Sequence, residues 1–245
     1  MIPYTDVHIH LLYDMDDGPK AREDMVEMLE AAARDGAARI VVTPHMTPGV
    51  SPFDEEKYAR RLEEAREIGR AMTPPVEVFG GAEILYSAET CAMLREGRVP
   101  TMAGTDIVLV EFSPNVKFEK LCRSLKDLSE SGFMPMLAHV ERYQCLAKWP
   151  LQAKWLKEQP VLYQVNANTF IRKMGLRGRW FLRTLAKNHL MDAIGTDAHN
   201  CSSRPTCMEK AYPAILKLCG ERYAQTLLDG SVLFDAGAHG HGGAE

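Results

Sequence analysis

Short apolar runs rich in β-branched residues alternate along this chain with longer amphipathic segments. Such alternation is typical of parallel strands joined by helical crossovers. Seven strand–helix units therefore predict an α/β fold whose strands curl into a parallel barrel. The predicted strands lie at residues 5–10, 40–43, 76–79, 107–110, 136–138, 162–165 and 193–195, and the predicted helices lie near residues 20–35, 55–72, 87–95, 117–131, 148–158, 173–189 and 204–219.

The length of 245 residues suits one such barrel, which routinely reaches this size without dividing. No repeat, coiled-coil heptad or internal linker interrupts the pattern, so we predict a single domain over residues 1–235. The last ten residues, 236–245, are small and glycine-rich, which predicts a flexible tail. His239 and His241 lie in that tail and are interpreted as tail residues rather than metal ligands.

The charged residues nearly balance, with 29 basic and 33 acidic side chains and a net charge of -4. No overall attraction to nucleic acid or anionic lipid follows, so any affinity for phosphate must be local. The chain shows no secretory signal and no apolar run long enough to insert into a membrane. Six cysteines without a Cys-x-x-Cys pair fit reduced thiols, so we expect a cytoplasmic protein.

Imidazole or carboxylate side chains stand at the carboxyl ends of five of the seven predicted strands. Five of the eight histidines lie in these positions, which chance scatter over helices and surfaces would not produce. The carboxyl ends of the strands in a parallel barrel all face one side, so these residues are expected to meet at one mouth. They are His8 and His10, then His45, Glu83, His139, and finally Asp197 with His199.

The spacing of His8 and His10 indicates a metal site, because side chains two apart on a strand point to the same face. Asp16 and Asp17 follow on an adjacent loop and add oxygen ligands, although one of them is also expected to cap the next helix. Imidazole combined with carboxylate and no thiolate suits Zn, Mn or Fe. Eight candidate ligands exceed the roughly four that one tetrahedral ion takes, so two or three ions are predicted.

Clustered divalent ions are typical of phosphate ester hydrolysis, since they lower the pKa of a bound water towards about 7 and clamp the phosphate oxygens. Arg142 follows His139, and Arg204 follows His199. Each guanidinium can donate two N–H groups to phosphate oxygens. Considered alone, either arginine could equally well form a surface ion pair with Glu141 or stabilise the start of a helix instead of binding phosphate. Their placement beside candidate ligands favours phosphate binding.

Taken in order, these motifs resemble the PHP superfamily, named for polymerase and histidinol phosphatase domains, and within it the CpsB/YwqE-type bacterial protein-tyrosine phosphatases. The likeness runs nearly end to end, and the order and spacing of the motifs are more specific than any one motif. The matching segments are His8-Ile-His10, Asp16-Asp-Gly-Pro-Lys20, Thr43-Pro-His45, Gly81-Ala-Glu83, Val110-Glu-Phe-Ser113, Ala138-His-Val-Glu-Arg-Tyr143, Gln164-Val-Asn166, Asp197-Ala-His-Asn200 and Ser203-Arg-Pro205.

The resemblance implies a distorted (β/α)7 barrel, similar to a TIM barrel, with three divalent metal ions, Mn before Fe or Zn. Asp17 and His199 would hold one ion, and Asp16 would keep a local structural role. Arg142 and Arg204 would bind the substrate phosphate. The ligands of the other two ions would be His8, His10, Glu83 and Asp197 for one, and Glu83, His45 and His139 for the other.

The resemblance also implies a substrate, which is phosphotyrosine on the tail of a partner bacterial tyrosine kinase that controls capsule or exopolysaccharide assembly. In the mechanism that we hypothesise, hydroxide bridging two ions attacks phosphorus, the two arginines stabilise the equatorial oxygens, and no phosphoenzyme forms. One departure from the family pattern is Met46-Thr47-Pro48, where we expect basic residues in some relatives. It predicts that peptide contacts on the rim of the mouth beside His45 differ. The sequence leaves assembly into a homo-oligomer open.

Other functions were weighed against this one. A thiol-based tyrosine phosphatase needs Cys and Arg six positions apart, and no cysteine here has that partner. A PHP-type small-molecule phosphatase, such as a histidinol-phosphatase, would use the same ions. A phosphodiesterase or nuclease is disfavoured by a slightly acidic chain that we interpret as lacking interleaved aromatic and basic residues. A binding protein that keeps metals only as structural ions is disfavoured because every candidate ligand is present.

Overall fold

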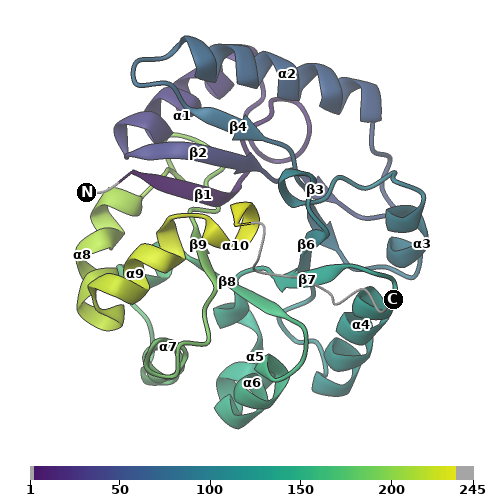
Figure 1. Cartoon of the computed structure of the whole chain (residues 1–245), viewed down its shortest axis with the longest axis vertical. Coiled ribbons are helices and arrows are strands. Elements are labelled where there is room, and N and C mark those ends of the chain that lie inside the picture. The colour runs from purple at the N-terminus through teal and green to yellow at the C-terminus, as the bar shows by residue number, and fades with distance from the viewer. Residues whose placement is uncertain (1–2, 236–245) are drawn as a thin grey trace.

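The computed structural model describes residues 3–235, so the predicted tail at 236–245 lies outside the described residues. Parallel strands form the wall of a barrel, and helices surround it (Figure 1). The strands make two sheets, ordered β1-β2-β4 and β3-β5-β6-β7-β8-β9. Their bounds are β1 Tyr4–Ile9, β2 Ala37–Val42, β3 His45–Met46, β4 Glu77–Phe79, β5 Glu83–Leu85, β6 Ile107–Glu111, β7 Met134–Leu137, β8 Leu162–Asn166 and β9 Ala193–Gly195.

The barrel closes between β1 and β9 through a narrow seam near their carboxyl ends. Ile9 and Ala198 form a parallel bridge there. His10 N donates to Ala198 O at 2.9 Å, and Asp197 N donates to His8 O at 2.7 Å. The seam joins the two sheets into one curled wall in which strand positions follow chain order. This arrangement confirms the predicted distorted (β/α)7 barrel.

Two of the seven predicted strand positions are bent, and the structure divides each into two short strands. β2 continues as β3 after Pro44, and β4 continues as β5 after Gly80 and Gly81. A Cβ atom on Gly80 would lie 2.6 Å from the hydroxyl of Tyr58, so only glycine fits against that side chain. The sequence pattern had placed one strand at 40–43 and one at 76–79, and it missed β3 and β5. The bends matter because β3 and β5 begin with His45 and Glu83.

The predicted helices are present, with two differences. A further short helix, α5, precedes the predicted helix at 148–158, which is present as α6, and the chain after residue 219 forms two further helices. The helices are α1 Arg22–Arg34, α2 Glu55–Ala71, α3 Thr90–Arg95, α4 Phe118–Glu130, α5 Gln144–Lys148, α6 Pro150–Lys157, α7 Leu176–Lys187, α8 Met208–Cys219, α9 Glu221–Leu228 and α10 Ser231–Phe234, with 3-10 turns η1 Met102–Gly104, η2 Val140–Arg142 and η3 Ala167–Phe170.

The start of α1 corrects one expectation about the acidic pair on the first loop. The N-cap of α1 is Ala21, and the Asp24 carboxylate accepts from the backbone N–H groups of Lys20 and Ala21. Neither Asp16 nor Asp17 caps this helix. Both acids are therefore available for contacts on the loop that lies over the barrel mouth.

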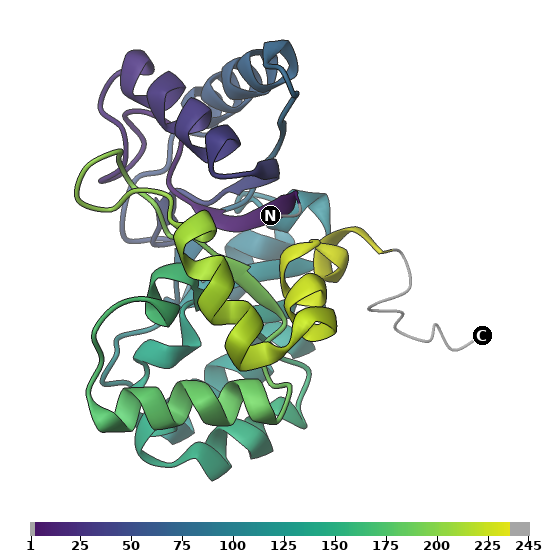
Figure 2. The same cartoon turned by 90° about the vertical axis from the view of Figure 1, so that its left-hand side faces the viewer.

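The barrel has an inner and an outer apolar layer, and its amino-terminal end is closed by α10. Leu233 of α10 packs in one buried cluster with Val7, Leu109 and Met136 from the strands. A larger buried cluster fills the space between the strands and the helices. Figure 2 shows α9 and α10 on the right of the barrel and the loops of the opposite end on the left. None of the helices in residues 3–235 is long and apolar enough to span a bilayer.

Candidate metal centre

The eight residues predicted as metal ligands come together at the carboxyl ends of the strands. Each position follows from local structure, because a side chain at the end of a parallel strand faces the mouth. The bends in strand positions two and three bring two of the ligands in from separate short strands. The ligands are His8 in β1, His10 and Asp17 on the loop after it, His45 in β3, Glu83 in β5, His139 after β7, and Asp197 with His199 after β9.

Glu83 lies at the centre of the group and is almost completely buried. Its Oε2 atom is 3.1 Å from the Nε2 atoms of both His8 and His10 and 3.2 Å from Nδ1 of His45. Its Oε1 atom is 2.7 Å from Nε2 of His139. One carboxylate thus contacts four imidazoles that come from three different strand positions, since His8 and His10 share the first.

Three groups of side chains offer ligand atoms that all lie within 4.8 Å of one another. The group of His8, His10, Glu83 and Asp197 has the members that the resemblance implied for one ion. A second group holds Glu111 beside His45 and Glu83, and Glu111 has no role in the sequence-based prediction. Nε2 of His139 is 3.5 Å from Oε2 of this glutamate. The groups are His8, His10, Glu83 and Asp197; His45, Glu83 and Glu111; and His10, Asp17, His45 and His199.

Glu111 had a recognisable signal in the sequence. It directly follows the apolar run at residues 107–110, so it occupies the same strand-end position as the assigned ligands. It lies in the segment Val110-Glu-Phe-Ser113, to which the sequence-based prediction gives no metal-binding role. In the structure it ends β6, and β6 pairs with β5, which carries Glu83.

Hydrogen bonds to the outer ring nitrogens orient three of the histidines so that Nε2 faces the pocket. His8 Nδ1 lies 3.1 Å from Gln164 Oε1, and His10 Nδ1 lies 2.6 Å from Asp16 Oδ2. His199 Nδ1 lies 3.1 Å from the carbonyl oxygen of Asp197. Partners of this kind fix the tautomer and leave Nε2 with a free lone pair, as in known metal sites.

Asp16 has the local structural role that the resemblance implied. Besides its contact with His10, its carboxylate accepts from the backbone N–H groups of Gly18 at 2.8 Å and His45 at 2.9 Å. These contacts hold the pKa of Asp16 below its usual range, although burial opposes the shift. The carboxylate therefore turns the first loop and ties it to β3.

A chain of buried amides links the histidines to Asp197. Gln164 Oε1 accepts from the backbone N–H of His139 at 2.7 Å, and Gln164 Nε2 donates to Asn166 Oδ1 at 3.0 Å. Asn166 Nδ2 donates to Asp197 Oδ2 at 2.6 Å. Both amides belong to the segment Gln164-Val-Asn166, to which the sequence alone gives no role. The structure shows that they hold candidate ligand side chains in position.

The pocket combines buried imidazoles with buried carboxylates, and their pKa values reflect this. Burial alone would lower the pKa of His10, but contacts with Asp16 and Glu83 outweigh it and raise the pKa to about 10. The pKa of His139 rises to about 9, because Glu111 and Glu83 outweigh burial in the same way. Burial would raise the pKa of Glu83, yet the neighbouring imidazoles hold it well below its usual range.

The donor set fits divalent cations. The Nε2 atoms of His8 and His10 are 3.3 Å apart, and Glu83 Oε2 is 3.1 Å from each, so three ligand atoms converge on one point. His199 Nε2 is buried and makes no hydrogen bond, although Asp17 Oδ1 lies 3.1 Å away. Such an orphaned nitrogen is unfavourable unless a cation or proton occupies the space that it faces.

Both predicted phosphate-binding arginines reach the centre, and both contact Asp197. The Nη2 atom of Arg142 is 2.6 Å from Asp197 Oδ2, and that of Arg204 is 2.9 Å from Asp197 Oδ1. Arg204 Nη1 is also 3.4 Å from Asp17 Oδ2. Glu141 accepts from the hydroxyl of Thr169 instead, at 2.8 Å. The two guanidinium groups thus lie beside candidate metal ligands, as predicted.

Two of the site residues have strained backbone. His139 and Asp197 have φ values of 35° and 55°, in the left-handed region that side chains other than glycine rarely adopt. Each residue lies two positions after the end of a strand, β7 or β9. A sharp change of chain direction there aims its side chain into the mouth. Strain of this kind persists where the surrounding contacts require it and gathers at functional sites.

A parallel (β/α)7 barrel whose carboxyl end gathers imidazoles and carboxylates for divalent cations defines a class, that of metal-dependent hydrolases with the PHP fold. The family model described as "Capsular polysaccharide synthesis, CpsB/CapC" matches residues 4–231. The chain therefore belongs to the CpsB/CapC family, which confirms the resemblance found in the sequence.

Named relatives cover nearly the whole chain. Tyrosine-protein phosphatase CpsB of Streptococcus pneumoniae is 31% identical over 231 residues, which span 91% of this chain and 93% of that protein. Tyrosine-protein phosphatase YwqE of Bacillus subtilis (strain 168) is 28% identical over 235 residues, 93% of this chain and 90% of that protein.

A solved structure agrees with these relatives. A chain from the crystal structures of YwqE from Bacillus subtilis and CpsB from Streptococcus pneumoniae, described as metal-dependent tyrosine phosphatases, superposes with a TM-score of 0.81. It is 26% identical, and the match covers 91% of this chain and 90% of that one.

Proposed function

We propose that this protein is a metal-dependent protein-tyrosine phosphatase of the cytoplasm. Its substrate is phosphotyrosine on the tail of a partner bacterial tyrosine kinase that regulates capsular or exopolysaccharide synthesis. The observation that carries the proposal is the convergence of imidazoles, carboxylates and two arginines at one barrel mouth, around the buried carboxylate of Glu83. The names of the relatives support phosphotyrosine as the substrate.

We assign three divalent ions to this centre, Mn before Fe or Zn. A neutral imidazole offers one lone pair, so His10 and His45 each serve one ion although each borders two groups. The third ion then has Asp17 and His199, whose atoms lie 3.1 Å apart. The other two sets are His8, His10, Glu83 and Asp197, and Glu83, His45 and His139 with the added Glu111.

Ions held by these residues would supply an activated water and neutralise charge on the phosphate. Arg142 and Arg204 orient the phosphoryl group by donating to its equatorial oxygens, over which charge is spread in the transition state. The oxygen of water forms a bond to phosphorus as the bond to the tyrosine oxygen breaks, and the phenol leaves with a proton. Because water supplies the attacking oxygen, we propose that no phosphoenzyme forms; the raised pKa of the Cys201 thiol on the rim, caused by partial burial, also disfavours its thiolate.

The rim beside His45 fits a peptide rather than a small sugar or amino alcohol. Met46 lines a surface groove of about 570 Å³ together with Val50, Phe53 and Met93. Glu55, Glu89 and Arg98 also border the groove, so it offers apolar and charged contacts to residues that flank a phosphotyrosine. Met46-Thr47-Pro48 stands where the resemblance leads us to expect basic residues, and this groove is where we place the different peptide contacts.

The test compares hydrolysis of a phosphotyrosine peptide, histidinol phosphate and a phosphodiester by Mn-loaded protein. We expect the peptide to react fastest. His139→Ala and Asp197→Ala should remove bound metal and activity together, whereas His189→Ala should change neither, because His189 is exposed and stacks on Tyr223 away from the mouth. Faster turnover of histidinol phosphate would favour the small-molecule phosphatase, and bound metal without any turnover would favour a binding protein.

A further inference from the structure

All three tryptophans of the chain are exposed, and they lie on one part of the surface. Trp149, Trp155 and Trp180 expose 65%, 48% and 55% of their side-chain area. Leu151 and Leu176 beside them expose 77% and 80%. Large apolar side chains grouped on a surface mark an interaction site, since single scattered ones are ordinary but a cluster leaves much apolar area in water.

The same part of the chain is strongly basic. Residues 148–191 contain nine basic residues and one acidic residue, Glu158, although the whole chain has 29 and 33. Eight of the nine have no ion pair within residues 3–235; Lys157 pairs with Asp192. The unpaired ones are Lys148, Lys154, Arg172, Lys173, Arg177, Arg179, Arg183 and Lys187. Aromatic and basic residues are therefore interleaved here, which corrects the interpretation that the chain lacks such a pattern.

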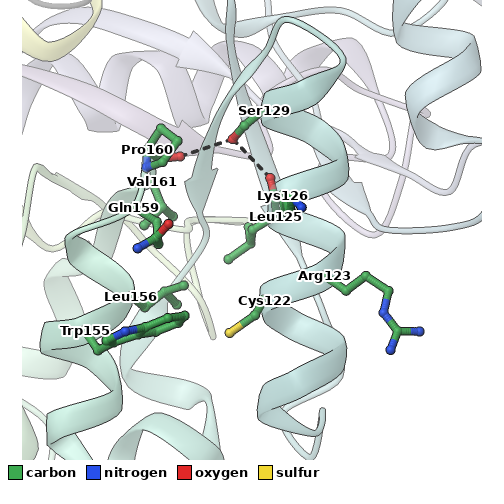
Figure 3. A pocket seen from close by; sticks show the side chains of 10 residues that line it. All are labelled: Cys122, Arg123, Leu125, Lys126, Ser129, Trp155, Leu156, Gln159, Pro160 and Val161. Carbon is green, nitrogen blue, oxygen red and sulfur yellow. Dashed lines mark hydrogen bonds between the residues drawn. The ribbon is translucent and has the colours of Figure 1, made fainter.

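These residues belong to neighbouring segments, namely α6 with Lys148 and Trp149 before it, the loop between η3 and α7, and α7, and we call their exposed side chains the tryptophan–basic face. Figure 1 shows α6 and α7 at the same edge of the barrel. Trp149 and Leu151 share a shallow apolar pocket with Trp180 and Thr184 of α7. On the other side of α6, Trp155 lies across a groove of about 290 Å³ from Cys122 and Leu125 of α4 (Figure 3).

We propose that the tryptophan–basic face binds the surface of an anionic lipid bilayer. Tryptophan rings favour the interface between the headgroups and the acyl chains, and exposed leucines can insert among the upper acyl groups. Lysine and arginine side chains attract anionic headgroups at short range. The face thus has both components of peripheral membrane binding, and it spans no membrane.

Other occupants fit this face less well. In a two-fold dimer, each basic residue would meet the basic residues of the second copy, which costs energy without acidic partners. A bound peptide needs a groove along the face, but Leu151 lines only the pocket beside Trp180, and Leu176, which is 80% exposed, lies outside that pocket. Nucleic acid would stack bases on the tryptophan rings, yet it gains nothing from the protruding aliphatic side chains.

The position of the face bears on the proposed function. The loop that carries Arg172 and Lys173 leaves η3, which begins directly after Asn166 of the metal centre. The face therefore runs from the rim of the mouth along α7. A bilayer in contact with it would lie beside the mouth, and, given the proposed function, phosphotyrosines carried close to a membrane would be the favoured substrates.

The test is sedimentation of the full chain with vesicles, without metal or substrate, so its result does not depend on phosphatase activity. We expect binding to vesicles that mix phosphatidylglycerol with phosphatidylcholine, weaker binding as NaCl rises, and little binding to phosphatidylcholine alone. Each basic residue near an anionic bilayer strengthens binding about fivefold. Arg177→Glu with Arg183→Glu should therefore raise the half-saturating lipid concentration more than about tenfold, and Trp149→Ala with Trp180→Ala should also weaken binding.

The matched control is Arg34→Glu with Arg60→Glu, which makes the same change in charge on exposed residues of α1 and α2. It should bind like the unchanged protein, and circular dichroism verifies that each variant is folded. Equal effects of the two charge reversals would overturn the proposal. So would self-association that the tryptophan changes abolish, or binding to poly-glutamate or to a poly-dT oligonucleotide without binding to vesicles.

Discussion

Gln164 provides a sharp test of how the metal centre is held in place. It is buried on β8, and its Oε1 atom accepts from the backbone N–H of His139 and lies beside Nδ1 of His8. Gln164→Leu keeps nearly the same volume but removes the acceptor. Two buried N–H groups then lose their partner, and Asn166 loses the donor that orients it towards Asp197.

The size of the effect follows from these contacts. A buried donor without a partner costs about 1–3 kcal/mol, so two of them should lower the free energy of unfolding by about 2–6 kcal/mol. The loss of a residue that orients metal ligands lowers metal affinity by about 10- to 100-fold. Both effects are expected together, because the amide that satisfies the two N–H groups also sets the direction of His8.

The assay combines urea unfolding with calorimetric titration of Mn into metal-free protein. Tyr163→Phe is the matched control, because Tyr163 is the preceding residue on β8 and its hydroxyl donates to Ala153 O in α6, away from the mouth. It should cost about 0.5–1.5 kcal/mol of stability and leave Mn affinity unchanged. The reasoning is refuted if Gln164→Leu binds Mn as tightly as the unchanged protein, or if both variants weaken Mn binding equally.

Three further expectations follow from the site. Arg142→Ala removes a charge-assisted contact to phosphate and should raise KM by about 10- to 100-fold with a smaller change in kcat; steady-state kinetics showing the reverse pattern would contradict this. Glu111→Gln should reduce the number of ions bound per chain, measured by elemental analysis, whereas Glu141→Gln should not, since Glu141 contacts Thr169. The raised pKa values of His10 and His139 stabilise the metal-free fold fully below their ordinary value of 6.5, and this contribution is lost as pH rises through about 9 to 10. The Tm of metal-free protein should therefore fall over that range relative to metal-loaded protein, and a parallel course of the two curves would count against it.

The order of elements and most of the candidate ligands can be predicted from the sequence alone. His8 and His10 point to one face because side chains on a strand alternate between its two faces. The positions of His139 and Asp197 near strand ends follow from the apolar runs that stop just before them. Both signals are local. The rule that parallel strands share one mouth then brings distant residues together without any knowledge of the packing.

How those residues share their contacts depends on the packing of the strands around them. Glu111 joins the centre because β6 pairs with β5, and Gln164 supports two histidines because the barrel brings β1, β7 and β8 around it. Close packing of Gly80 against Tyr58 bends a strand that the pattern shows as straight. Exposure of Trp180 likewise depends on which helix face meets the barrel. Each of these outcomes rests on contacts between residues far apart in the chain, where side-chain direction is set by packing rather than by local periodicity.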